Sequence, residues 1–213
     1  MAITYPLSLP TVSGIRSIVL RTKNTVGLSQ SPFTFKQQVV SYGGQAWEAD
    51  ITLPPMVRDD AEEWVSFLVQ LKGIEGTFLL GDPSGATPRG SASTTPGTPV
   101  VNGAGQIGAV LNISGAPASA SNYLKAGDYI QLGSGSGAKL HKVLKNVDTN
   151  ASGEAALDIY PSMRSSPSAD APANSVVVSN AKGLFRLSSN ETQWSINEVT
   201  HFGVTFGAME VVE

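Results

Sequence analysis

The chain has 213 residues, a formal net charge of −3, a mean hydropathy near zero and no cysteine. This length allows one domain or two small ones, and the small net charge gives no overall attraction to nucleic acid or anionic membranes. The lack of cysteine excludes disulfides, a thiol nucleophile and cysteine-ligated zinc, and leaves His141 and His201 as the imidazole groups.

The first ten residues, MAITYPLSLP, contain neither the basic segment nor the apolar segment of a secretory signal. No later stretch approaches the ~20 apolar residues of a membrane-spanning helix. The sequence therefore predicts a protein that is made in the cytoplasm and does not insert into a membrane.

Strands are predicted over residues 15–22 and 33–53. Within the second segment, Gly43 and Gly44 are expected to form the two-residue turn of a hairpin, because glycine adopts positive φ without strain. Apolar and polar residues then alternate, which is typical of a strand with one packed and one wet face. The packed face would hold Trp47, Ala49, Ile51 and Leu53, and the wet face Glu48, Asp50 and Thr52.

One helix is predicted after Pro54 and Pro55, which cannot donate to a sheet. Asp59 is expected to cap this helix, with Glu62 at capping-box spacing, and Gly73 stands where a C′ glycine would end it. Helical spacing gives one apolar stripe, which must cover a sheet face. The stripe consists of Ala61, Trp64, Val65, Leu68 and Leu71.

The aromatic residues divide the chain. Every Trp and Phe lies before Ser84 or after Gly183, and the segment between begins and ends with Gly/Pro/Ser/Thr-rich stretches. We interpret residues 1–84 plus 184–213 as a discontinuous host domain and residues 85–183 as an inserted domain. The host is net negative and the insert net positive.

Short strand patterns separated by Gly, Asn and Ser fill the insert, and aromatic strands close the host. The predicted fold class is mainly β: a β-sandwich host domain with one flanking α-helix, interrupted by a small inserted β-barrel or β-sandwich domain.

No motif predicts an enzyme, a cofactor or a metal. GSGSGA, residues 133–138, lies between two predicted strands, which favours a hairpin loop over a phosphate-binding turn. The segment from Asp148 imitates a calcium loop, but Ile159 stands where the bidentate glutamate belongs. His141 and His201 have no readable catalytic partner, and the acidic residues at the helix start suit the helix dipole.

The order of elements nevertheless resembles a known family. A hairpin with YGGQAW, the LPPM break, an acidic helix, LKGIEGTFLLGDP and a closing aromatic strand ending in FGAMEVVE are similar to phage distal tail proteins, near the lambda-type minor tail protein. The resemblance covers the host, about half of the chain, and does not extend to the insert.

The resemblance implies a virion protein that forms a homohexameric ring between the tail tube and the tail tip hub. It implies the tail tube protein and the hub protein as partners, with the tape measure and fibre proteins as further candidates. Such a ring lets DNA pass without specific binding. Glu48 and Asp50 are then candidates to face the channel, because a conduit that releases DNA should avoid basic walls.

Two other functions stay open at this point. A tail tube subunit shares the sandwich-plus-helix architecture and would form many stacked rings. A carbohydrate-binding module is favoured if the insert tyrosines, Tyr123, Tyr129 and Tyr160, form an exposed platform.

Overall fold

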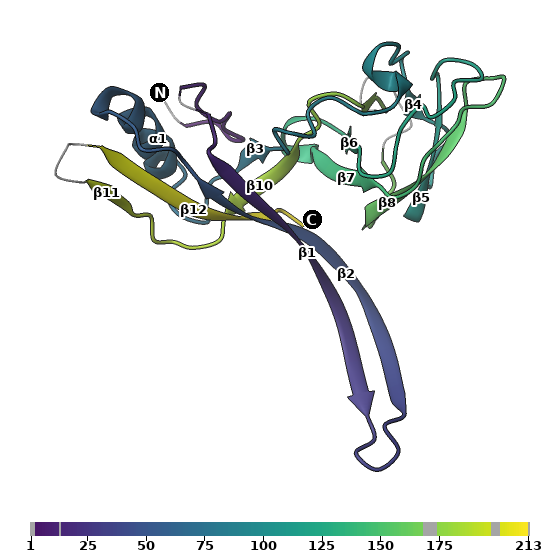
Figure 1. The fold of residues 1–213 in the computed structure, drawn as a ribbon, viewed down its shortest axis with the longest axis horizontal. Helices are drawn as coiled ribbons and strands as arrows, with labels where there is room; N and C mark the ends of the chain where they lie inside the picture. The colour runs from purple at the N-terminus through teal and green to yellow at the C-terminus, as the bar shows by residue number, and fades with distance from the viewer. Residues whose placement is uncertain (1–2, 13, 168–173, 197–200, 213) are drawn as a thin grey trace.

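A computed structural model describes residues 3–12, 14–167, 174–196 and 201–212. The chain is mainly β with one α-helix, as predicted. Two sheets lie side by side, and a long two-stranded ribbon projects from the first of them (Figure 1).

The first sheet has the strand order β1-β2-β12-β10-β3, with β11 paired to β12, and all its pairings are antiparallel. It draws on both ends of the chain, because β12 returns to lie between β2 and β10. Its strands are β1 (Ser17–Gln30), β2 (Gln37–Thr52), β3 (Phe78–Leu80), β10 (Gly183–Leu187), β11 (Trp194–Ile196) and β12 (Phe202–Glu210).

Helix α1 (Arg58–Gln70) is the second layer of this half of the molecule (Figure 1). Trp64 lies against Phe206 of β12, with ring centroids 6.2 Å apart, and Phe67 lies against Phe78 of β3 at 5.5 Å. The helix thus closes the core over the sheet. All five residues of the apolar stripe are buried: Ala61, Trp64, Val65, Leu68 and Leu71.

The start of α1 differs from the expectation. Val57 is the N-cap residue and makes no side-chain cap bond, so Asp59 does not cap the helix and no capping box forms with Glu62. Met56 exchanges backbone hydrogen bonds with Phe202, which keeps the chain extended up to the residue before Arg58. Asp59 therefore lies inside the first turn, where its charge still suits the positive end of the helix.

The end of α1 also differs by one residue. Leu71 is the C-cap, and Lys72 rather than Gly73 occupies the first left-handed position, at φ +50°. Gly73 follows at φ +71°, where an added Cβ would lie 2.9 Å from the Cα of Asn190. Both the backbone angle and the close approach therefore require glycine at this position.

The turn between β1 and β2 does not lie at Gly43 and Gly44, which corrects the hairpin prediction. The chain reverses over Ser31–Lys36, where the Phe35 N–H donates to the Ser31 carbonyl at 2.9 Å. β2 runs on through both glycines, and the register shifts there between Asn24 and Val26. The glycine pair is therefore an irregularity inside a long strand, with Gly43 alone at positive φ.

The second sheet has the strand order β4-β5-β8-β7-β6-β9. A bridge between Val100 and Ser175 joins its two ends, so the sheet curls into a nearly closed barrel. Its own buried cluster includes Tyr123, Leu111 and Ile113. The strands are β4 (Val100–Val101), β5 (Gly108–Ser114), β6 (Tyr129–Leu132), β7 (Lys139–Val143), β8 (Ala155–Met163) and β9 (Val176–Val177). Short 3-10 turns are η1 (Ser91–Ser93) and η2 (Gly135–Gly137).

Trp47 of β2 joins the two halves. Its indole N–H donates to the Leu140 carbonyl of β7 at 3.1 Å, and its ring lies edge-on to Tyr160 at 5.4 Å. Tyr129 and Leu140 belong to the core cluster of the first sheet. Whether residues 85–183 fold independently of the host stays a prediction.

Candidate functional site

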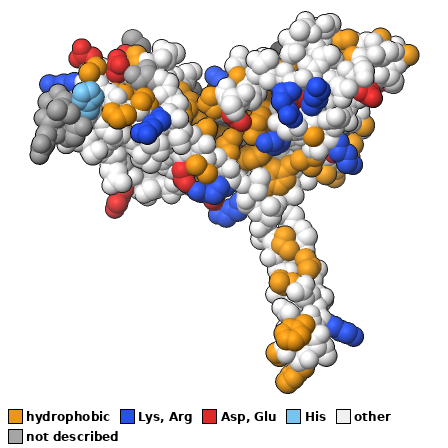
Figure 2. Space-filling model, viewed as in Figure 1, with side chains coloured by type: hydrophobic (Ala, Val, Ile, Leu, Met, Phe, Trp, Pro, Cys, Tyr) orange, Lys and Arg blue, Asp and Glu red, His pale blue; other side chains and the backbone are white. Residues whose placement is uncertain are grey.

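The outer part of the β1–β2 hairpin, residues 24–45, is called the arm, and its apolar side chains are largely exposed. Phe33 and Phe35 at its tip are 91% and 72% exposed. Figure 2 shows hydrophobic side chains along the arm and at its end. Exposed apolar side chains gathered on one projecting element are typical of an interaction surface. The other exposed apolar residues of the arm are Val26, Leu28, Val39, Val40 and Tyr42.

The arm carries a single charged residue, Lys36, which directly follows Phe35. The ribbon is held by its own ladder, with Leu28 opposite Val39 and Gly27 opposite Val40. Apolar side chains therefore lie on both faces of the ribbon, because directly paired residues share a face and neighbours along a strand alternate.

Glu48 and Asp50, the residues predicted to face a channel, lie at the base of the arm and are paired. Lys23 donates to Glu48 at 2.7 Å, and Arg21 forms a forked contact with Asp50. The hydrogen bond and the charge of Asp50 raise the pKa of Arg21. The four charges cancel locally. Sequence reasoning missed the two cations because their position depends on the register between β1 and β2.

A shallow groove of about 450 Å³ lies between α1 and the N-terminal segment. We call it the helix groove. Asp59, Glu62 and Glu63 line it, so the acidic residues of the predicted cap become the wall of a concave surface. Glu62 also lies 3.6 Å from Arg58, one helical turn before it. The remaining lining residues are Leu7, Ser8, Pro10, Ser66, Phe67 and Gln70.

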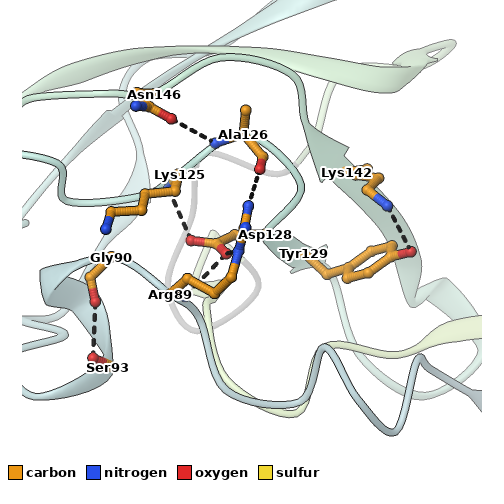
Figure 3. Close-up of polar contacts among 9 residues, drawn as sticks. All are labelled: Arg89, Gly90, Ser93, Lys125, Ala126, Asp128, Tyr129, Lys142 and Asn146. Atoms are coloured by element: carbon orange, nitrogen blue, oxygen red, sulfur yellow. Dashed lines mark hydrogen bonds and ion pairs between the residues drawn. The ribbon is translucent and has the colours of Figure 1, made fainter.

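A polar cluster fixes the start of the insert to its barrel (Figure 3). The carboxylate of Asp128, 3% exposed, accepts from the backbone N–H groups of Arg89 and Lys125 at 3.0 and 2.8 Å. The Arg89 side chain donates to Asp128 and to the Ala126 carbonyl. These donors reach both oxygens of the Asp128 carboxylate, which gives the cluster a structural role.

Beside that cluster, Lys142 lies 4.7 Å from the centroid of the Tyr129 ring and 3.2 Å from its hydroxyl (Figure 3). Tyr123 and Tyr129 are buried, and Tyr160 is partly buried against Trp47. The three insert tyrosines therefore do not form an exposed platform for sugar rings.

A cavity of about 510 Å³ lies where the two halves meet, and His141 lines it. His141 is 3% exposed and its Nδ1 lies 2.6 Å from the Pro161 carbonyl. A carbonyl only accepts, so Nδ1 carries the proton and Nε2 bears a lone pair. Nε2 has no hydrogen-bond partner among the described residues. Burial lowers the pKa of His141 to about 4, with Lys139 and Arg164 acting in the same direction.

This buried histidine makes the stability depend on pH. Between pH ~6.5 and ~4 the unfolded chain binds a proton at His141 that the folded chain does not, so the free energy of unfolding falls on acidification, by roughly 3 kcal/mol in total. Denaturant titrations of the wild type and of His141→Leu across this window check this. The advantage of the wild type over the variant should shrink by that amount as the pH falls.

The comparison with the variant also removes the contribution of Glu210. Burial raises the pKa of Glu210, so this carboxyl adds stability on acidification, opposite in sign to His141. Both proteins keep Glu210, and its effect cancels in the difference. A difference that stays constant from neutral pH to pH ~4 would contradict a neutral, buried His141.

The other residues considered from sequence do not converge on a site. His201 precedes β12 and does not line the His141 cavity. The calcium-like segment is a turn in which the Asn150 side chain accepts from the Ser152 and Glu154 amides. Within the described ranges, no cluster of three or more His, Asp or Glu residues is arranged to hold a metal ion. The same ranges hold no helix of the length and apolarity that crossing a membrane demands.

No protein-family model matches this chain, and no curated protein matches it significantly.

Proposed function

We propose that the chain is a structural subunit of a bacteriophage tail. In this proposal it is a distal tail protein that forms a hexameric ring between the tail tube and the tail tip hub and surrounds the DNA channel. The observation that carries the proposal is the arm, which leaves its own sheet with apolar side chains exposed on both faces and two exposed phenylalanines at its tip.

An arm of this composition is a surface for assembly. A two-stranded ribbon without a covering layer is marginally stable in water, and its exposed apolar side chains gain free energy only when another surface covers them. In the described part of the chain, the apolar side chains of the arm remain exposed. A second copy of the chain can cover these side chains. Its local concentration is high once a ring has begun to form.

The charge distribution around the arm suits a conduit for DNA. The arm has one cation, Lys36, and at its base Glu48 and Asp50 are each paired with a cation. A wall of this kind has little net charge to hold phosphates, so DNA would pass without being retained. The order of elements, which resembles that of distal tail proteins, supports the same assignment. The tail tube protein, the hub protein, the tape measure and fibre proteins are the partners it implies.

The proposal is tested on the purified full chain. Mass photometry and negative-stain electron microscopy over a wide concentration range should give closed particles of six 22.2 kDa chains with a central opening. Long tubes of stacked rings would instead favour the tail tube alternative. A chain that stays monomeric at every concentration, and adds no subunits when mixed with tail tube rings, would overturn the proposal.

A further inference from the structure

We propose that the arm tip of one copy docks into the helix groove of a second copy. The tip consists of Phe33, Phe35 and Lys36. The groove lies between α1 and the N-terminal segment and carries Asp59 and Glu63 on its wall. This inference rests on the self-assembly proposed above and assigns the two surfaces that make the contact.

The tip is a shaped loop rather than a loose end. The Ser31 N–H donates to the Lys36 carbonyl at 2.9 Å, and the Phe35 N–H donates back to the Ser31 carbonyl, which closes the loop at both sides. Phe35 has φ +55°, in the left-handed region that bulky residues rarely adopt. Backbone strain of this kind is typical of functional positions, and the side chains of both tip phenylalanines are exposed beside it.

The groove offers the complementary chemistry. Leu7, Pro10 and Phe67 supply apolar surface, and three carboxylates stand around it. The groove is open to solvent and has a volume of about 450 Å³. Phenyl rings can lie against the apolar part while an ammonium group reaches the acidic wall.

Charge selects the second copy as the occupant. Lys36 is the only charged residue of the arm, and it lies at the tip. Among the ion pairs of the described residues, Glu62 is paired with Arg58, whereas Asp59 and Glu63 take part in none. The groove therefore keeps excess negative charge beside apolar surface, and the tip brings one cation beside two aromatic rings.

The contact has to form between copies. In Figure 1 the arm leads away from α1, and its tip and the helix lie at opposite ends of the first sheet. One copy cannot satisfy both surfaces by itself. A contact that joins two different patches is heterologous, and its repetition generates a closed ring or a continuing stack.

Zero-length crosslinking tests the contact directly. A carbodiimide joins a lysine amine to a carboxylate only when the two groups are in contact. The full chain, mixed from ¹⁴N- and ¹⁵N-labelled protein, should yield mixed-isotope peptides that link Lys36 to Asp59, Glu62 or Glu63. Lys36→Arg keeps the charge but removes the amine, so this variant should lose the crosslink and still assemble.

Charge reversal is a second, independent test of the contact. Lys36→Glu is expected to weaken self-association about tenfold, and combining it with Glu63→Lys should restore much of that loss. Arg16→Glu, which makes the same change in net charge outside both surfaces, is the matched control and should leave association unchanged. Replacing Phe33 and Phe35 together with serine should weaken association about a hundredfold.

The outcomes separate this inference from the proposed function. Rings that form with Lys36 crosslinked to other positions, or without rescue by Glu63→Lys, would overturn the docking site and leave the ring assignment standing. Failure to assemble under any condition would overturn the proposed function and this inference with it.

Discussion

Trp64→Ala is expected to lower the free energy of unfolding by about 3 to 5 kcal/mol, as truncation of buried tryptophans does. Trp64 of α1 is fully buried against β12, and its ring lies edge-on to that of Phe67, with the centroids 6.0 Å apart. Its indole N–H donates to the Val12 carbonyl at 3.0 Å, so the N-terminal segment is also attached through it. Removing the side chain leaves a cavity and an unsatisfied carbonyl. Chemical denaturation followed by circular dichroism measures the loss.

Asp59→Ala is the matched control on the same helix. Asp59 makes no cap hydrogen bond, so its removal costs only the interaction with the helix dipole, below about 1 kcal/mol. Equal losses for the two variants would mean that the helix does not pack on the sheet through Trp64.

Trp47→Ala is expected to cost a similar amount, about 3 to 5 kcal/mol, and to loosen one half of the molecule from the other. The buried indole lies against Tyr129 at 6.1 Å and Tyr160 at 5.4 Å, and it donates to Leu140. These contacts connect β2 with three strands of the second sheet. Thermal unfolding of the variant should separate into two transitions, where the wild type shows one.

Hydrogen exchange measures the loosening between the two halves. The Leu184 amide, which donates across the junction to the Ala138 carbonyl at 3.0 Å, should lose protection in Trp47→Ala. Trp194→Ala is the control, because Trp194 on β11 is 42% exposed and its truncation should cost little. Unchanged exchange at Leu184 would mean that Trp47 does not couple the two halves.

The spacing of apolar residues along the chain predicted the helix and the packed strand face well. The 3.6-residue spacing from Ala61 to Leu71 placed the helix and its buried stripe, and the alternation from Trp47 to Leu53 placed the packed face of β2. Glycine and asparagine breaks in the insert marked most of its strands. The two-residue β4 is too short to give a periodic signal.

Features that depend on distant partners were not predictable in this way. The Gly43–Gly44 pair has turn chemistry, but pairing with β1 extends past it, and Ser31–Lys36 reverses the chain instead. The bonds between Met56 and Phe202 moved the helix start away from Asp59. The pairing of Glu48 and Asp50 with cations follows from the register between β1 and β2. The burial of His141 follows from the way the two sheets meet.

The antiparallel pairing of β3 with β10 has a consequence for how such a protein can diversify. Leu80 lies opposite Gly183, so the chain leaves the first sheet and returns to it at neighbouring positions. For the first sheet, the segment between Leu80 and Gly183 is therefore one long hairpin connection. Lengthening such a connection costs little entropy. We expect that another domain could replace the insert there provided that it covers Trp47. Under the proposed function, such an exchange would change the outward surface of the subunit and leave its ring-forming half as it is.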